Sequence, residues 1–569
     1  MPILRRYSSS LLFLVIALLC VASSGRAQVY AGKPKLIVIV VIDQFRGDYL
    51  NRFHDQFKGR GFRLFTDEGA WFTNCYYDYA NTKTAPGHAT IGTGAYTDGH
   101  GIDSNEWWDF SRSSTRQVSS VEDERYKLVD VPESSLPSHQ PDAKTGAPDF
   151  LVGSSPRNLR ATTLGDELRL ATQGKARVFG VSLKDRASIL PSGQSASASY
   201  WLEPSSGQFT TSTYYMEHLP EWARAFNSSG RREQAAREAL AEGTTEFFEQ
   251  VGRMPAANSY ELDFAKALIQ GEKLGQSQVT DELTISLSAN DLEGHTFGPD
   301  SPQEKQMVLS LDKDLDSFFA WLDKTVGLNN VWLALTADHG VAPVPGEAAQ
   351  LGISAAAVDI DKVYEQVNAR LNARYSRGET ASYLMSGPDL PYVVLNKAAF
   401  TAAGVDENGA EETVGTLLRE EVAALGAPAQ GQPAQHRLPP SPHVQAVYTR
   451  LQLANSELPP TEWGRRIAHS YADHGNWFVM CILDAYQIQG RGSNGTTHYS
   501  PWSYDRHVPL AFHGTPFAPG EYRDRVAPVD LAATFASLAG VNQPSASVGR
   551  VLTEALKAEN RVGTAAGKK

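Results

Sequence analysis

The chain has 569 residues, of which 41% are hydrophobic and 20% are charged, and its formal net charge is −12 at pH 7. This length and composition allow a large globular core, built as two or more domains or as one α/β domain with insertions. The basic residues are scattered rather than clustered, which argues against nucleic acid or an anionic membrane surface as the main partner.

Residues 1–27 have the pattern of a secretory signal peptide. Two arginines precede an apolar run from Leu11 to Ala22, and small residues after it suit cleavage before Gln28. The run is too short to span a bilayer comfortably, and no later stretch approaches the roughly 20 apolar residues of a membrane helix. We therefore expect a periplasmic or secreted protein without a membrane span.

The three cysteines do not indicate a disulfide framework. Cys20 lies in the leader and could indicate a lipoprotein, but Leu19 stands where such a site needs a small residue. Cleavage would leave Cys75 and Cys481, which form either one bond or two buried thiols. Neither has Cys or His neighbours at structural-zinc spacing.

Apolar runs predict the strands of a mostly parallel, buried sheet. The first, Leu36 to Ile42, is nearly all β-branched and has no polar alternation, which is typical of a strand buried on both faces. Similar runs cover residues 176–182, 283–288 and 331–335, a late strand is expected at 508–512, and a closing helix at 529–538. The first four runs each end in polar residues, where open α/β sheets carry their sites.

Two long segments between these runs are expected to form a cap beside the site. Residues 193–275 are rich in Ser, Tyr and charged helical stretches, and residues 344–466 include a loop rich in Pro and Gln. Neither resembles sheet core, and long excursions between core elements are usually functional or separately folded. We therefore expect one catalytic domain over residues 34–555 with these insertions, followed by a tail at 556–569.

The segment Asn81 to Gly94 contains a candidate nucleophile. Thr84 is followed by Ala-Pro-Gly and a weakly apolar run, a pattern that predicts a hydroxyl on a tight turn that opens a helix. Free N–H groups in a first helical turn favour an anion. A plain helix cap fits the same residues, so the choice depends on whether partners for a nucleophilic threonine exist elsewhere.

Such partners are candidate metal ligands. Asp43 follows the first strand, Asp291 and His295 stand four apart, and Asp338 and His339 end the fourth strand. Asp and neutral His are good zinc ligands, and the absence of Cys from these clusters suits a catalytic site. Taken singly, each of these residues is more often a cap or a satisfied polar group.

Two further segments bear on the ligand set. His498, in Gly-Thr-Thr-His, is another candidate ligand. The string Ala-Asp-His-Gly occurs twice, at Ala337 and at Ala472, but only the first copy follows a buried apolar run. We therefore assign ligands to the first copy.

The ordered set of motifs resembles the alkaline phosphatase superfamily. Asp43, the Thr84-Ala-Pro-Gly-His turn, Asp291 with His295, Asp338-His-Gly and the Gly-Thr-Thr-His498 segment are similar to its threonine-nucleophile branch, which contains type I phosphodiesterases and bacterial phosphate-irrepressible alkaline phosphatases. The resemblance runs from about Leu36 to Leu538 and implies an alkaline phosphatase-like α/β fold, with a mostly parallel sheet sandwiched by helices.

The resemblance also implies roles for individual residues. One zinc would be held by Asp291, His295 and His498, and the other by Asp43, Asp338, His339 and the oxygen of Thr84, the nucleophile. Asn105 matches an asparagine that contacts a phosphate oxygen, and Lys184 and Arg186 match a pair typical of the monoesterase branch. Tyr499 departs from the glycine that often follows the last histidine, and His88 is expected to be structural. Sulfatase chemistry is disfavoured, because Thr84 replaces the cysteine or serine that it needs.

A charge count favours a monoester substrate. Two Zn²⁺ ions, three aspartates and the Thr84 alkoxide sum to zero, so Lys184 and Arg186 would match a phosphate monoester dianion. In this reading two metals activate the hydroxyl and stabilise the leaving oxygen. The reading is a monomeric, exported di-zinc phosphomonoesterase that forms a phospho-threonine and acts on small phosphate esters. A phosphodiesterase or nucleotide pyrophosphatase, and a non-catalytic phosphate- or metal-binding module, are the alternatives.

Overall fold

The structure is a computed structural model, and it describes residues 32–131, 152–376, 378, 380–425, 442–490 and 495–557. The expected signal peptide, residues 1–27, lies outside these residues, as does most of the expected C-terminal tail. Within the described ranges, no helix combines the length and apolar character that crossing a bilayer requires.

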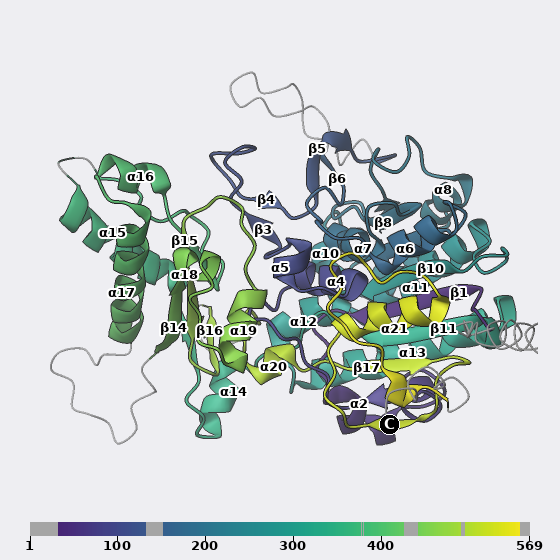
Figure 1. The fold of residues 1–569 in the computed structure, drawn as a ribbon. Helices are drawn as coiled ribbons and strands as arrows, with labels where there is room; N and C mark the ends of the chain where they lie inside the picture. The colour runs from purple at the N-terminus through teal and green to yellow at the C-terminus, as the bar shows by residue number, and fades with distance from the viewer. Residues whose placement is uncertain are drawn as a thin grey trace, which may run out of the picture.

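A nine-stranded sheet forms the centre of the larger lobe (Figure 1). The strand order is β18-β2-β17-β11-β1-β10-β7-β8-β9. Five adjacent strands, β11, β1, β10, β7 and β8, run parallel, while β17 is antiparallel to both of its neighbours. The bounds in chain order are β1 (Leu36–Ile42), β2 (Ala70–Phe72), β7 (Val178–Ser182), β8 (Ala198–Leu202), β9 (Phe209–Thr210), β10 (Asp281–Leu287), β11 (Val331–Thr336), β17 (Leu510–His513) and β18 (Gly520–Tyr522).

The apolar runs of the sequence form these strands as expected. Every residue of β1 is buried, and the strand is paired in parallel on both sides, which explains its unbroken β-branched composition. The runs at 176–182, 283–288, 331–335 and 508–512 correspond to β7, β10, β11 and β17, and the closing helix is α21 (Val529–Ala539). The expected α/β architecture is confirmed.

Helices flank the sheet in two groups. Helices α4 (Thr84–Thr93), α6 (Leu164–Ala171), α7 (Asp185–Ser192) and α21 contact one another, and so do α11 (Pro255–Gly271), α12 (Ala289–Phe297) and α13 (Pro302–Thr325). Their apolar side chains join those of the strands in one core, in which, for example, Trp332 of β11 stacks on Phe535 of α21. This packing fixes the ends of the central strands, where the candidate site lies.

The expectation that residues 193–275 lie outside the sheet is wrong. This segment supplies β8 and β9, which extend the central sheet at one edge. Its helices α8 (Glu221–Asn227), α9 (Arg231–Glu238), α10 (Phe247–Gln250) and α11 bury side chains in the main core. The strands are hard to recognise from this polar, Tyr-rich composition, because the buried side chains of β8 include Tyr200 and Trp201, whereas those of β1 are aliphatic.

A second lobe lies beside the first, on the left in Figure 1. We use this name for the described parts of residues 345–490. It has its own apolar core and two small sheets, β13-β15-β14 and β12-β16. Its elements are α14 (Pro345–Gln350), β12 (Ala356–Val358), α15 (Ile360–Tyr375), β13 (Tyr392–Val394), α16 (Lys397–Ala402), α17 (Glu407–Leu425), β14 (Val444–Thr449), α18 (Arg450–Ala454), α19 (Glu462–His469), β15 (Phe478–Leu483) and β16 (Gln487–Gln489). The lobe therefore extends past residue 466.

The two cysteines of the described chain are separate. Cys75 and Cys481 are both free and buried, one in the main core and the other in the core of the second lobe. Burial raises the pKa of both thiols. They therefore act as small apolar residues rather than as a cross-link.

A close backbone contact sets the position of α4. A Cβ placed on Gly87 would lie 2.7 Å from the Cβ of Asp338 and closer still to the Asp338 carbonyl oxygen. The hydroxyl of Tyr77 donates to the Ala337 carbonyl at 2.9 Å on the same side. The first turn of α4 can approach the end of β11 only because residue 87 has no side chain.

We expect Gly87→Ala to lower the free energy of unfolding by about 1–3 kcal/mol, because the methyl group has no space. Chemical denaturation of purified protein would measure the change. Gly490→Ala is the matched control, since the nearest atom to a Cβ there is 3.8 Å away. Equal stability of the two variants would contradict the close-packing argument.

Candidate metal centre and active site

Loops at the ends of the central strands bring the candidate residues together. Asp43 directly follows β1, Asp338 follows β11, and Asp291 lies in the first turn of α12 after β10. Lys184 is the residue before α7, beyond β7. These four strands are parallel neighbours, so their carboxyl ends open onto one edge of the sheet.

Three histidines are held in the same way, each by a backbone carbonyl at Nδ1. His295 contacts the Thr496 carbonyl at 2.9 Å, His339 that of Gly340 at 3.0 Å, and His498 that of Thr82 at 2.5 Å. A carbonyl can only accept, so Nδ1 carries the proton in each ring. In the neutral form of each ring this leaves a lone pair on Nε2 that can bind a metal, which is the usual arrangement of ligating histidines.

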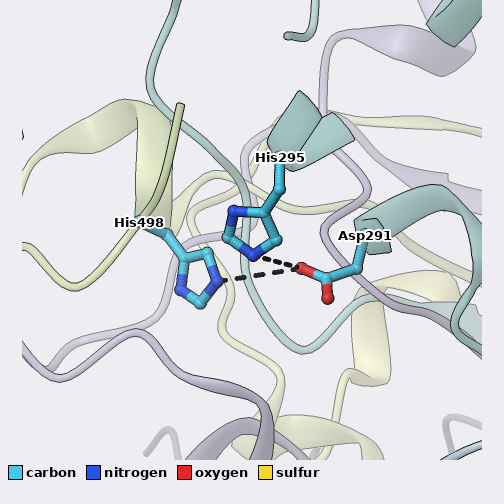
Figure 2. Close-up of side chains that lie close together, drawn as sticks. All are labelled: Asp291, His295 and His498. Carbon is cyan, nitrogen blue, oxygen red and sulfur yellow. Dashed lines mark ion pairs between the residues drawn. The ribbon is translucent and has the colours of Figure 1, made fainter. Parts of the chain in front are cut away.

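The first candidate metal group consists of Asp291, His295 and His498 (Figure 2). The Asp291 Oδ1 atom lies 3.2 Å from Nε2 of His295 and 3.8 Å from Nε2 of His498. Asp291 and His295 are one helical turn apart on α12, as their spacing predicts, and His498 comes from a loop some 200 residues later in the chain. The structure thus brings together the three residues expected to form one site.

The second candidate group lies around His339. Asp43, Asp291 and His339 offer ligand atoms within 4.8 Å of one another. Asp338 belongs to the same cluster, because its Oδ2 atom lies 3.4 Å from His339 Nε2. The geometry therefore contains the expected trio of Asp43, Asp338 and His339, and it adds Asp291 as a carboxylate that faces both groups.

Three buried atoms of this second group have no hydrogen-bond partner, which indicates whether the group fits a cation. Asp43 Oδ1, Asp338 Oδ2 and His339 Nε2 are all buried and have no hydrogen-bond partner. Buried polar atoms of this kind are costly unless something binds them. All three are lone-pair donors that lie close together, so their chemistry fits a divalent cation held by Asp and His ligands.

The pKa shifts of the residues in this cluster also fit a bound cation. Burial, with the nearby charge of Asp43, raises the pKa of Asp338 well above its usual value. Burial lowers the pKa of His339 and, together with the other two histidines, that of His498, so both rings are neutral near pH 7. Burial and the charge of Asp291 oppose the ionised form of Asp43, but the charge of Lys184, with smaller contributions from Asp338 and His339, outweighs them and holds the pKa of Asp43 below its usual value.

Lys184 is the cation that faces these carboxylates. Its Nζ lies 2.5 Å from Asp43 Oδ2 and 2.6 Å from Asp291 Oδ2. It therefore pairs here with two candidate metal ligands. Arg186 lies one residue into α7, and its buried Nε atom has no hydrogen-bond partner. A guanidinium with an unused buried donor is suited to an anion.

Thr84 is the first residue of α4 and is only 2% exposed. Asn105 is attached to the same turn, because its Oδ1 accepts a 2.8 Å hydrogen bond from the backbone N–H of Ala85. The side-chain NH₂ of Asn105 is thereby left to donate elsewhere. His88 contacts the Thr84 carbonyl and the Ser286 hydroxyl through its two ring nitrogens, which supports a structural role for this histidine.

The loop that carries His498 is tied to the turn before Thr84. The hydroxyl of Thr82 accepts hydrogen bonds from the backbone N–H groups of Tyr499 and Ser500. Tyr499 has a φ of +100°, a conformation that glycine adopts readily and other residues rarely do. The departure from glycine noted in the sequence therefore lies at a strained position, which the Thr82 contacts hold in place.

Two residues of the site region were not expected from the sequence. Lys83, next to the candidate nucleophile, is fully buried and pairs with Asp389 of the second lobe at 2.6 Å. Its ammonium also donates to Ser104 and lies 4.8 Å from the centre of the Tyr499 ring. The sequence could have indicated Lys83, because it directly precedes Thr84. Nothing in the sequence around Asp389 connects that residue with this site.

Comparisons with known proteins identify the family of this chain. Residues 37–477 match the sequence profile of the family described as type I phosphodiesterase / nucleotide pyrophosphatase. The chain is 31% identical to alkaline phosphatase PhoV of Synechococcus elongatus, over 92% of this chain and 93% of the relative. It is 30% identical to alkaline phosphatase PafA of Elizabethkingia meningoseptica, over 92% and 95%.

A solved structure shows the same fold. The crystal structure of wild-type alkaline phosphatase PafA superposes with a TM-score of 0.77 at 29% identity, covering 92% of this chain and 99% of that one. The family expected from the ordered motifs is thereby confirmed. This chain belongs to the type I phosphodiesterase / nucleotide pyrophosphatase family of the alkaline phosphatase superfamily.

Proposed function

We propose that this protein is an exported, monomeric di-zinc alkaline phosphatase that hydrolyses phosphate monoesters through a covalent phospho-threonine intermediate. The cluster of unpartnered, buried ligand atoms on Asp43, Asp338 and His339, beside Asp291, His295 and His498, supports it most directly. The similarity to relatives named alkaline phosphatase supports the choice of monoesters.

The ligands divide into two sets. We assign Asp291, His295 and His498 to one zinc, and Asp43, Asp338, His339 and the Thr84 oxygen to the other. When bound, two such ions supply positive charge that lowers the pKa of a hydroxyl and stabilises a leaving oxygen. Asp291 faces both sets in the structure, which suits two ions at close range.

The chain's own groups then carry the reaction. The Thr84 oxygen attacks phosphorus, a P–O bond to threonine forms, and the P–O bond to the alcohol breaks. Water subsequently breaks the phospho-threonine bond and releases phosphate. Asn105 would donate to a phosphate oxygen, because its carbonyl is already engaged by Ala85 and only its NH₂ is available.

Lys184 and Arg186 would select the monoester. In this structure the Lys184 ammonium pairs with Asp43 and Asp291 and offsets part of their negative charge, a task that zinc would take over. Its ammonium, together with the unused Nε of Arg186, would then compensate the second negative charge of a monoester.

We further propose that residues 34–555 form one catalytic unit, in which the second lobe is a cap.

The family description keeps a second candidate open, a phosphodiesterase or nucleotide pyrophosphatase. Thr84, Asn105 and the proposed metal ligands would serve either reaction. A diester carries one negative charge less, so it has less need of Lys184 and Arg186. The two candidates therefore differ in what these two side chains contribute.

We expect Thr84→Ala to lower kcat/KM for an aryl phosphate by about 10³-fold or more, because the nucleophile is lost. Zinc binding, measured by calorimetry, should persist through the remaining ligands. Thr84→Ser keeps a hydroxyl and should retain measurable turnover. Full activity in Thr84→Ala would exclude a phospho-threonine.

The double variant Lys184→Ala, Arg186→Ala should reduce monoester hydrolysis by about 10²-fold, since two charge-assisted contacts to the dianion disappear. Hydrolysis of the matched aryl diester should fall by far less. Steady-state kinetics on the ester pair would measure both. Equal losses would remove the reason for choosing monoesters.

Zinc should stabilise the folded protein, by about 2.7 kcal/mol at a concentration 100 times its dissociation constant. We expect the rise in Tm on adding zinc to chelator-treated protein to shrink in Asp338→Asn. Asp473→Asn is the matched control, because Asp473 occupies the same place in the second Ala-Asp-His-Gly string. Identical shifts in both variants would contradict the assignment of Asp338.

A further inference from the structure

Gln44 lies where three strands of the central sheet end. It is the second residue after β1, and the backbone N–H of its neighbour Asp43 donates to the Leu287 carbonyl, at the end of β10, at 3.0 Å. The side chain of Asn290 donates to the Asp43 carbonyl at 3.1 Å. Gln44 is 1% exposed, and the reaction proposed above gives it no role.

Gln44 contacts one carboxylate of each proposed zinc set. Its backbone N–H donates to Asp338 Oδ1 at 3.0 Å, and its side-chain Nε2 donates to Asp291 Oδ1 at 2.6 Å. Asp338 follows β11 and Asp291 follows β10, so one residue after β1 joins ligands from both neighbouring strands. The amide has one possible direction, because a carboxylate accepts and only the NH₂ of glutamine donates.

The contact with Asp338 selects the oxygen that stays available for a cation. Asp338 Oδ1 accepts from the backbone N–H groups of Gln44 at 3.0 Å and His339 at 2.9 Å. Asp338 Oδ2 has no hydrogen-bond partner and lies 3.4 Å from His339 Nε2. The two N–H groups therefore orient the carboxylate without occupying the oxygen that would bind the metal.

The contact with Asp291 holds this carboxylate from a second side. Lys184 Nζ lies 2.6 Å from Asp291 Oδ2, but in the proposed reaction Lys184 would contact the phosphate. The Gln44 amide is neutral, so it can stay on Asp291 without cancelling the negative charge that attracts a cation. Asp291 Oδ1 still has a lone pair for a metal beside Nε2 of His295 and of His498, which lie 3.2 and 3.8 Å away.

Backbone conformation and packing both place the Gln44 amide against α12. Gln44 has a φ of +62°, which residues other than glycine rarely adopt and which persists only where the surroundings hold it. Gly294, the residue before His295, leaves space for the amide, because a Cβ there would lie 2.2 Å from Gln44 Oε1. The local structure of both segments therefore favours the contact between Gln44 and Asp291.

We propose that Gln44 is a positioning residue that orients one carboxylate of each zinc set. The inference rests on the zinc sites of the proposed function. Gln44 acts through Asp291 and Asp338 and binds neither zinc nor the ester. Without its amide, Asp291 could rotate away from His295 and His498, so zinc should bind there less tightly. Residues that support a ligand in this way typically contribute about 10- to 100-fold to metal affinity.

The test measures zinc binding by competition with a chromophoric chelator. Gln44→Met keeps the length of the side chain and the backbone N–H to Asp338 but removes the donor to Asp291. We expect the Kd of one of the two zinc ions to rise about 10- to 100-fold and that of the other to change far less. Gln44→Gly also lacks the amide but relieves the left-handed φ, so it should show the same loss.

Gln173→Met is the matched control, because Gln173 is an exposed glutamine with a similar φ of +54°. Its zinc affinity should equal that of wild type. Unchanged affinity in Gln44→Met would overturn the positioning role and leave the phosphatase intact. If that variant does not fold, unchanged affinity in Gln44→Gly would do the same. Weakened zinc binding, with no turnover of an aryl phosphate by zinc-loaded wild type, would support the positioning role and overturn the phosphatase.

Discussion

The crowding of three carboxylates at one edge of a parallel sheet is the constraint on which the site depends. Asp43, Asp291 and Asp338 are buried within a few ångströms of one another, and like charges in such a place cannot all remain ionised without compensation. In this structure Lys184 provides part of that compensation. Divalent cations would provide it in full, with the Nε2 atoms of His295, His339 and His498 completing the ligand sets.

The rest of the architecture serves to hold these groups in place. Parallel pairing of β11, β1, β10 and β7 brings segments that are far apart in sequence to one edge, and close packing at Gly87 sets the start of α4 against that edge. The second lobe contributes no candidate metal ligand from its described residues, but through Asp389 it contacts Lys83, the residue before Thr84. Precise chemistry is thus built from loops fixed by a rigid sheet.

Much of this could be predicted from the sequence, because buried parallel strands leave a strong pattern and the polar residues after them follow directly. The strands around Asp43, Asp291 and Asp338 are of this kind. The edge strands β8 and β9 were missed, since their aromatic and polar residues lack the β-branched signature. The pairing of Lys83 with Asp389 could not be foreseen, because it depends on how two lobes meet rather than on any local pattern.

The pairing of β2 has a consequence for how the chain reaches this structure. β2 bonds only to β17 and β18 in the described sheet, and Thr73, just beyond it, donates to the carbonyl of Tyr522, 449 residues away. Contacts of such sequence separation are slow to form, because a long loop must close before they stabilise anything. In a growing chain, β2 therefore stays unpaired until residues 510–522 have been made, and the central sheet is completed only after that segment joins it.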